Sequence, residues 1–310
     1  MNARKTLARI AAHEDLNFLL TNRIPRIQLT RFMGWFSRIE NPVVRAASMA
    51  VWRLFTDIDL SDAKKPRFAS LHDCFTRELR PGARPIDADP EVLVSPCDGI
   101  VGACGPVQGT QVFQAKGFPY TVPELFGPDP AAPGFVDGVY VTLRLTSAMY
   151  HRFHAMQAGR VERVTYLSGD TWNVNPIALA RIERLFCRNE RAVITQRLDA
   201  GGHRVSLVAV AAVLVASIRL RFLDVLLSLR WRGPNRMDCD HPCDKGEELG
   251  WFEHGSTIIV FAPAGFRLQD GIETGRRIRM GEPLLRLPAA TAESSPCHRA
   301  AVQSGQEPGS

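Results

Sequence analysis

The stretch Phe252-Glu253-His254-Gly255-Ser256-Thr257-Ile258-Ile259-Val260-Phe261 decides the predicted fold. Its second half consists of β-branched and apolar residues, which is typical of a buried strand. Gly255 and Ser256 stand directly before that strand, where a Gly-Ser pair is usually a turn. Glycine also reaches strained backbone conformations, so Ser256 could instead attack the carbonyl group of its own neighbour. The stretch therefore predicts a strand and leaves two interpretations of the Gly255-Ser256 bond, a turn or a reactive bond.

Short β-rich runs of the same kind precede this stretch and are separated by Gly and Pro. Their spacing predicts a mostly antiparallel sheet. One helical interruption is expected at residues 175–186, and another short helix at 70–80. The expected fold class is α+β, with N-terminal amphipathic helices followed by a mostly antiparallel, β-sandwich-like core. The predicted strands are 92–95, 139–145, 161–167, 192–198, 204–216 and 256–261.

The first 60 residues have a helical pattern with aromatic and basic side chains. Residues 1–55 hold nine Lys/Arg and three Asp/Glu, whereas the rest of the chain is balanced at 29 of each sign. Apolar anchors with basic flanks are typical of a helix that lies in a membrane interface. Packing against the protein's own core would explain the same pattern. The candidate docking residues are Phe32, Trp35, Phe36 and Trp52.

The composition is that of an ordinary globular protein, with 310 residues, 45% hydrophobic and 23% charged. Seven scattered cysteines do not suggest a disulfide framework and suit a reducing compartment. No signal peptide and no apolar run of membrane-spanning length is expected. The predicted organisation is a helical membrane-docking segment at 1–68, a β-rich catalytic domain at 69–288 and a tail of disordered composition at 289–310.

A reactive serine would need a base and a group that orients the base. Tyr150-His151-Arg152-Phe153-His154 offers two histidines, which would lie near each other if the segment were helical. A metal-binding pair and surface histidines are the alternatives. Ser95-Pro96-Cys97-Asp98-Gly99 offers the carboxylate of Asp98, although Asp-Gly is also a common hairpin turn.

Six segments, SPCDG, QAKGFPY, YHRFH, SGDTWNVN, RNER and HGST, occur in this order. Together they resemble the phosphatidylserine decarboxylase family, from about residue 19 to residue 287. The resemblance implies a carboxy-lyase that converts phosphatidylserine to phosphatidylethanolamine. It also implies that the proenzyme cleaves itself between Gly255 and Ser256, and that Ser256 becomes a covalent pyruvoyl group, the only cofactor expected.

The resemblance also implies roles for the site residues. Asp98, His154 and Ser256 would form the self-cleavage triad, with His154 as the base and Asp98 orienting it. His151 would be the acid–base group near the substrate carboxylate. Lys116 in QAKG could meet the lipid phosphate or be an exposed hairpin lysine. The products, residues 1–255 and 256–310, would form a heterodimer, and a dimer of heterodimers is the larger assembly considered.

The expected partner is an anionic membrane that contains phosphatidylserine, because basic charge near such a surface is attracted to it. The resemblance thus favours a peripheral protein on the cytoplasmic face of the cell membrane. Nucleic acid is not expected, since no recognition motif accompanies the charge. The competing hypotheses are a pyruvoyl decarboxylase of a soluble amino acid and a biotinyl- or lipoyl-like carrier module, the latter suggested by residues 281–287.

Four features depart from the family pattern or fall outside it. His254 stands where the family usually has Leu, Met149 where it has an acidic residue, and Cys97 where a small apolar residue is common. A Cys-x-His-x-Cys segment is a candidate metal site by residue type, but its spacing is unusual for zinc and it lacks a clear fourth ligand. We therefore predict a variable loop and no metal there, at Cys239, His241 and Cys243.

Overall fold

A computed structural model describes residues 13–23, 25–114, 118–213, 217–253 and 256–289. Its largest sheet has eight strands, and every neighbouring pair is antiparallel. The predicted α+β class is confirmed. In spatial order the strands are β12 (Arg236–Cys243), β7 (Gly159–Leu167), β8 (Arg191–Leu198), β9 (Arg204–Ala211), β14 (Ser256–Ala262), β5 (Val139–Leu145), β2 (Gly99–Pro106) and β16 (Arg277–Ile278).

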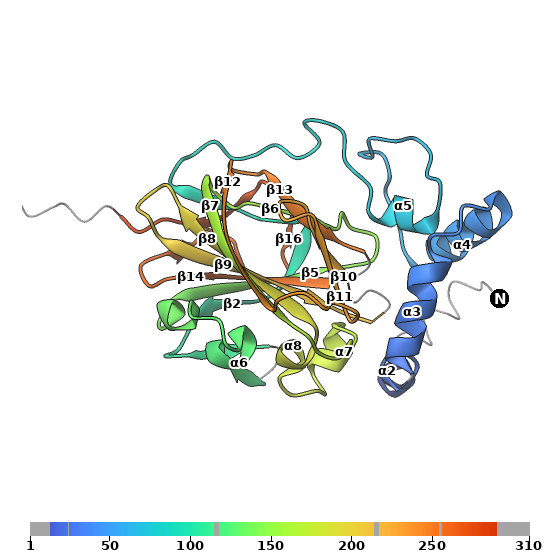
Figure 1. Ribbon diagram of the computed structural model, residues 1–310, viewed down its shortest axis with the longest axis horizontal. Helices are drawn as coiled ribbons and strands as arrows, with labels where there is room; N and C mark the ends of the chain where they lie inside the picture. Colours follow the sequence, from blue (N-terminus) through green and yellow to red (C-terminus); the bar gives the residue numbers. More distant parts are fainter. Residues whose placement is uncertain (1–12, 24, 115–117, 214–216, 254–255, 290–310) are drawn as a thin grey trace, which may run out of the picture.

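A four-stranded sheet covers one face of the large sheet and makes the core a sandwich (Figure 1). Ile258 and Val260 of β14 share a buried cluster with Phe153 and Phe252 of this second sheet. The second sheet consists of β11 (Val225–Ser228), β10 (Ser217–Leu220), β13 (Glu248–Phe252) and β6 (Arg152–His154). Smaller sheets are formed by β1 (Val92–Val94), β17 (Pro283–Arg286) and β15 (Arg267–Leu268), and by β3 (Gln111–Phe113) and β4 (Pro119–Thr121).

Short helices cover the opposite face of the large sheet, below it in Figure 1. Phe261 of β14 packs there against Phe126 and Phe135, with ring centroids 5.3 and 5.9 Å away. The helix predicted at 175–186 is two short helices, because Arg184 has a φ of 52° and so cannot continue a right-handed helix. The elements on this face are α6 (Val122–Phe126), η1 (Ala132–Phe135), α7 (Pro176–Leu179) and α8 (Leu185–Arg188).

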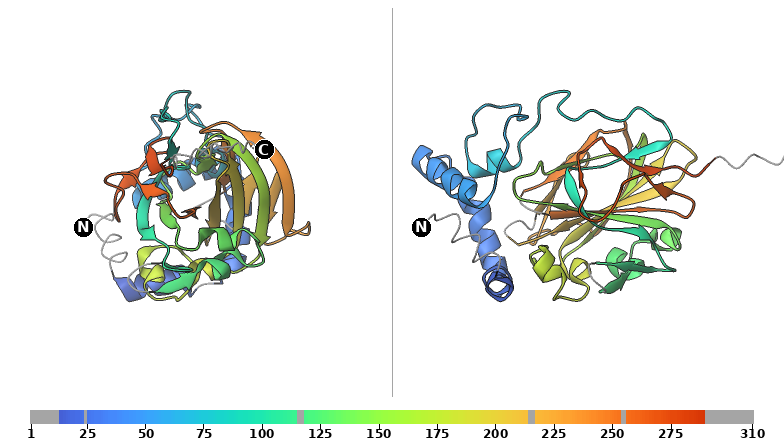
Figure 2. Two further views of the ribbon diagram at one scale, coloured as in Figure 1. Left: turned by 90° about the vertical axis from the view of Figure 1, so that its left-hand side faces the viewer. Right: turned by 180° about the vertical axis from the view of Figure 1, so that it is seen from behind.

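Four helices from the N-terminal part lie together beside one end of the core (Figures 1 and 2). They are α2 (Glu14–Asn22), α3 (Arg26–Phe36), α4 (Pro42–Phe55) and α5 (Leu71–Phe75). The side chain of Asn41 caps α4 by accepting hydrogen bonds from Val43 N and Val44 N, at 3.0 and 3.3 Å. Within the described parts of the chain, no helix is long and apolar enough to cross a membrane.

The α5 helix is shorter than the helix predicted at 70–80 and belongs spatially to the N-terminal helices. The ring of Phe75 in α5 stacks on Trp52 of α4, with centroids 5.9 Å apart. The helical layer therefore extends beyond residue 68, where the sequence suggested a boundary. The tail predicted at 289–310 lies outside the described residues, except for Ala289.

The SGDTWNVN segment fastens the N-terminal helices to the core. Arg26 of α3 forms an ion pair with Asp170 at 2.7 Å and lies over the ring of Trp172 at 3.7 Å. Asn173 N donates to the side chain of Asn22 at the end of α2, at 3.1 Å. These contacts fix the position of the helices relative to the sheet end where β14 begins.

Candidate active site

Ser256 is the first residue of β14 and is completely buried. It pairs with Leu145 of β5 on one side and with Ala211 of β9 on the other. Because side chains alternate along a strand, Ser256 lies on the same face as Ile258, the face covered by the second sheet. Its hydroxyl has no hydrogen-bond partner among the residues that the structure describes. A buried hydroxyl without a partner is costly, and such groups in native structures often have a chemical role.

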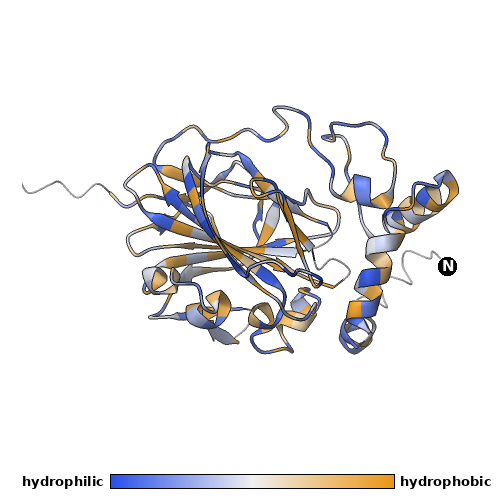
Figure 3. Cartoon of the chain, in the orientation of Figure 1, coloured by the Kyte–Doolittle hydropathy of each residue, from blue (hydrophilic) through white to orange (hydrophobic). Residues whose placement is uncertain are grey.

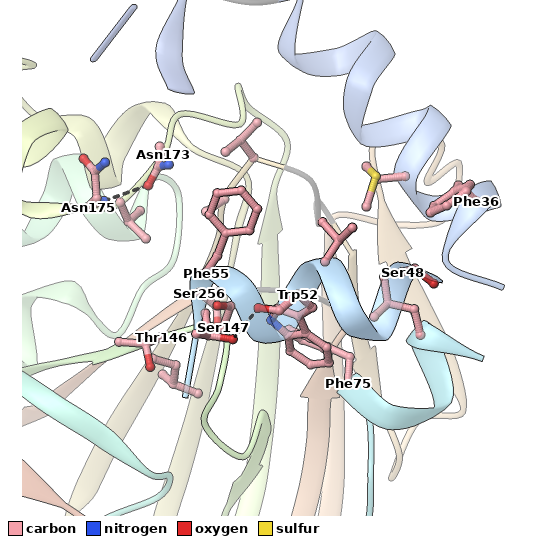
Figure 4. A pocket seen from close by; sticks show the side chains of 18 of the residues that line it. Phe36, Ser48, Trp52, Phe55, Phe75, Thr146, Ser147, Asn173, Asn175 and Ser256 are labelled. Atoms are coloured by element: carbon pink, nitrogen blue, oxygen red, sulfur yellow. Dashed lines mark hydrogen bonds between the residues drawn. The ribbon is translucent and has the colours of Figure 1, made fainter. Parts of the chain in front are cut away.

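Ser256 lines a cavity of about 1000 Å³ between the core and the N-terminal helices (Figure 4). The wall formed by α3 and α4 is mostly apolar and includes Phe36, Trp52 and Phe55. The polar lining comes mainly from core loops. An apolar cavity with a few polar groups at one end is typical of a site for an amphipathic ligand. The polar lining residues are Thr56, Arg144, Thr146, Ser147, Asn173, Asn175 and Ser256, together with Ser48 of α4.

His151 lies on the side of the second sheet that faces this cavity. Its backbone carbonyl accepts a hydrogen bond from Phe252 N at 3.0 Å, so His151 is the cross-strand neighbour of Phe252. Phe252 points into the sandwich, and the side chain of His151 therefore points to the same face of the second sheet. Its ring packs on Phe75, with centroids 4.0 Å apart, and Phe75 lines the cavity. Its Nδ1 is 2.8 Å from the carbonyl oxygen of Met149. Since a carbonyl only accepts, Nδ1 carries the proton and Nε2 is the basic nitrogen of the neutral ring.

His154 points to the other side of the second sheet. It lines a separate polar cavity of about 370 Å³ together with Arg84, Tyr150 and Glu248. Its Nδ1 is 2.9 Å from the carbonyl oxygen of Gly246, so its Nε2 accepts the hydrogen bond from the Tyr150 hydroxyl at 3.0 Å. Burial lowers the pKa of His154 below its ordinary value of 6.5. The imidazole is therefore neutral at pH 7 and able to take up a proton.

Asp98 lies directly before β2. Its segment runs beside that of His154, since His154 N donates a hydrogen bond to Pro96 O at 2.8 Å. Its carboxylate, however, accepts a bidentate pair from Arg84 at 2.8 and 2.6 Å, and a bond from Met280 N at 3.0 Å. The ring nitrogens of His154 contact Gly246 and Tyr150 instead. The direct orientation of His154 by Asp98, which the resemblance implied, is thus not the arrangement in this structure.

Strand spacing relates Asp98 to Ser256. The register pairs Ser256 of β14 with Leu145 of β5. The residue before Leu145, Arg144, pairs with Ile100 of β2, two positions after Asp98. Asp98 is therefore at the same end of the sheet, two strands or roughly 10 Å away.

Arg84 was missed by the sequence reasoning, because nothing near residue 84 indicates a partner for a carboxylate 14 positions later. Tyr150 was inside a quoted motif, but its role as a partner of His154 needs the fold.

The candidate docking residues divide into two pairs. Phe32 and Trp35 are exposed, by 52% and 64%, whereas Phe36 and Trp52 are partly buried and line the cavity. Further exposed apolar side chains lie on α4, along the apolar stretch that Figure 3 marks in orange. They are Val43, Val51, Leu54 and Phe55.

The remaining predicted positions lie outside the described residues or away from both cavities. Lys116, His254 and Gly255 lie outside the described residues. The prediction of a variable loop at Cys239, His241 and Cys243 was wrong, because these residues belong to β12, an edge strand paired with β7. Among the described residues, no group of three or more His, Cys, Asp or Glu side chains is arranged to hold a metal ion.

A buried serine at a strand start, which lines an amphipathic cavity and lies on the face covered by the sheet that carries His151, is an arrangement suited to acyl transfer on an amphipathic substrate. Residues 71–286 match the family model of phosphatidylserine decarboxylase. The chain belongs to the phosphatidylserine decarboxylase family, a family of carboxy-lyases, and the predicted resemblance is confirmed.

Curated relatives match over most of their lengths. The phosphatidylserine decarboxylase proenzyme of Halorhodospira halophila is 41% identical over 250 residues, which cover 76% of this chain and 81% of that protein. The proenzyme of an Anaeromyxobacter species is 37% identical over 269 residues, with coverage of 84% and 94%. That of Myxococcus xanthus is 35% identical over 277 residues, with coverage of 86% and 97%.

Proposed function

We propose that this protein is a proenzyme that cleaves itself between Gly255 and Ser256 and then decarboxylates phosphatidylserine to phosphatidylethanolamine. The observation that carries the proposal is the position of Ser256. It is a buried serine at the start of a central strand, and its side chain lines a cavity that suits a lipid. Membership of the family supports the reaction type.

Self-cleavage starts at the hydroxyl of Ser256. Its oxygen attacks the carbonyl carbon of Gly255, and the peptide nitrogen leaves, so that an ester replaces the amide. Loss of the Cα proton of residue 256 then expels the Gly255 carboxylate. The dehydroalanine that remains tautomerises, and water hydrolyses it to a pyruvoyl group with release of ammonia. Ser256 fits this role because its Oγ faces the cavity and has no competing hydrogen bond among the described residues.

The geometry favours His151 as the base in self-cleavage, the reverse of the allocation that the resemblance implied. His151 lies on the Ser256 side of the second sheet, and its basic nitrogen is Nε2. His154 faces the polar cavity and would exchange protons there through Tyr150. Asp98, held by Arg84, would contribute its charge to this cluster rather than a direct bond to either ring.

The cavity supports a lipid substrate rather than a soluble amino acid. Its polar end could hold the serine headgroup beside residue 256, and the apolar wall of α3 and α4 could hold acyl chain. The pyruvoyl carbonyl supplies an electron sink for the pair released when the carboxylate leaves as CO2. The polar lining residues at this end would hold the headgroup beside residue 256.

The exposed apolar side chains of α3 and α4 support docking on a membrane surface. Phe32, Trp35 and Phe55 are exposed on the helices that also wall the cavity. Inserting them into the interface would bring the cavity to the lipid. The basic excess of the N-terminal part would favour an anionic surface, on the cytoplasmic face of the cell membrane.

Intact mass spectrometry of the purified protein tests the proposal. We expect two masses that correspond to residues 1–255 and 256–310, the smaller with a ketone in place of its amino terminus. Ser256→Ala should give a single chain without activity. Decarboxylation of phosphatidylserine vesicles by that uncleaved variant would refute the mechanism, and turnover of free serine instead of the lipid would refute the substrate.

A further inference from the structure

Glu253 stands two residues before the cleavage site and is held by groups from three different parts of the chain. Arg38, just beyond α3, donates to both of its carboxylate oxygens at 2.9 and 2.8 Å. Ser217 of β10 donates its hydroxyl to the same carboxylate at 2.9 Å. The Nε2 of His72 in α5 is 3.9 Å from it. We call these four residues, Arg38, His72, Ser217 and Glu253, the Glu253 clamp.

The Glu253 clamp is a mostly buried, multiply hydrogen-bonded group rather than an isolated ion pair on the surface. The side chain of Glu253 is only 14% exposed, although that of Arg38 is 51% exposed. The backbone also takes part, since Glu253 N donates to Ser217 O at 3.3 Å and His72 N donates to Ser37 O at 2.8 Å. A charged hydrogen bond shared by several donors is stronger and more directional than an isolated surface ion pair.

The position of the clamp gives it a specific role. Ser256 is anchored downstream by its place in β14, between β5 and β9. Glu253 is anchored upstream by the clamp. Attack by a hydroxyl on a neighbouring carbonyl depends strongly on orientation, and misplacement by 1 Å can lower a rate by about 100-fold. Fixing both ends of so short a connection limits the orientations of the bond between them.

We infer that Glu253 is a positioning residue for self-cleavage and that Arg38 makes the reaction depend on the seating of the N-terminal helices. This inference rests on the proposed cleavage at Gly255-Ser256. The helices that supply Arg38 also form the apolar wall of the cavity that Ser256 lines. A precursor whose helices are not seated would then cleave slowly, so that the reactive group forms only when the cavity is complete.

Cleavage rates of the full chain test this inference. The chain is synthesised in a cell-free translation system, and the cleaved fraction is followed on a gel over time. We expect Arg38→Gln and Glu253→Gln to slow cleavage by about tenfold, because each removes one side of a charged pair near the reacting bond. The exchange of both charges, Arg38→Glu with Glu253→Arg, should restore most of the rate.

Two controls separate positioning from folding. Arg181→Gln breaks a different ion pair between the core and the N-terminal helices, 2.8 Å from Arg181 to Asp15, and should leave the rate unchanged. The clamp substitutions in an uncleavable Ser256→Ala background should leave the thermal unfolding midpoint near that of Ser256→Ala alone.

The outcomes are distinguishable. If the wild-type chain cleaves and both single variants cleave at its rate, Glu253 has no positioning role. If the variants are slow only in proportion to a lowered unfolding midpoint, and the charge exchange does not rescue them, the clamp acts through folding and the inference is wrong. If the wild-type chain never cleaves, the proposed function itself fails.

Discussion

The two histidines of the YHRFH segment illustrate how local conformation decides a residue's role. In a helix, positions i and i+3 share a face, whereas an odd separation in a strand places side chains on opposite faces. Residues 152–154 form β6, and Phe153 points into the sandwich. His151 therefore faces the Ser256 side and His154 faces the polar cavity. The two rings work in different surroundings, although they are three residues apart.

The protonation of His154 is a first prediction at this scale. Because burial lowers its pKa, its titration midpoint should lie below 6.5, and the ring should stay neutral at pH 7. NMR titration of labelled histidines in the Ser256→Ala precursor measures this midpoint, and His154→Gln identifies the resonance. A midpoint above 6.5 would contradict the prediction.

Glu190, in the RNER segment, gives a second prediction at the residue scale. It is fully buried, it accepts a hydrogen bond from the Tyr166 hydroxyl at 2.6 Å, and burial raises its pKa from 4.5 to about 7. Between pH 4.5 and about pH 7, the Glu190 side chain is protonated in the folded protein and ionised in the unfolded chain. Stability should therefore fall as the pH rises through this window, by about 3 kcal/mol at most.

Glu190→Gln should remove this dependence. The free energy of unfolding is measured from pH 5 to pH 8 in the Ser256→Ala background, with and without Glu190→Gln. We expect the variant to lose less stability over this range than its parent, by up to about 3 kcal/mol. Equal losses in the two proteins would show that Glu190 does not titrate as a buried acid.

At the scale of elements, α3 and α4 serve two surfaces at once. One side of each helix lines the cavity through residues such as Phe36 and Trp52, while Trp35 of α3 and Leu54 of α4 are exposed by 64% and 46%. Packing on the core and exposure on the surface, the two alternatives that the sequence left open, thus concern different residues of the same helices.

Phe32→Ala combined with Trp35→Ala should weaken binding to anionic vesicles by about tenfold or more, because two aromatic side chains no longer enter the interface. Vesicle sedimentation measures the binding, and a gel measures self-cleavage, which should persist. The control Val136→Ala removes an apolar side chain that is 41% exposed but lies outside the N-terminal helices. It should change neither vesicle binding nor self-cleavage. Unchanged binding in the double variant would place the docking surface elsewhere.

At the scale of the whole molecule, cleavage would cut the chain at the start of a central strand. After cleavage β14 belongs to the smaller product, yet it remains paired with β5 and β9, and Phe261 remains between Phe126 and Phe135. The new ends would separate locally while the sheet and both faces of the core hold the products together.

The two products should therefore elute together in size-exclusion chromatography under native conditions. They should separate only in denaturant, when the sheet unfolds. Ser256→Ala, which has the same core in one chain, provides the reference elution volume. Loss of the product 256–310 from the native protein would mean that strand pairing does not hold the chains together.

The sequence by itself determined much of this protein. Alternating and apolar runs predicted β5, β7, β8 and β14 nearly to their ends, because local residue pattern and strand period coincide there, whereas β9 ends at Ala211 and is shorter than the strand predicted at 204–216. The ordered motifs identified the family and singled out Ser256. The predicted helices at 70–80 and 175–186 came out shorter or broken, because backbone conformation at single residues such as Arg184 is not visible in an apolar pattern.

Only the tertiary structure decided which residues meet. The pair of Arg84 with Asp98 joins residues 14 positions apart, and that of Arg38 with Glu253 joins residues 215 positions apart. Tyr150 and His154 are only four positions apart, but their hydrogen bond requires the strand conformation of β6. A sequence lists donors and acceptors, but their pairing depends on which strand ends and helix ends the fold brings together. The division between a mostly apolar cavity and a polar one follows from that packing and from the alternation of side chains along a single strand, β6.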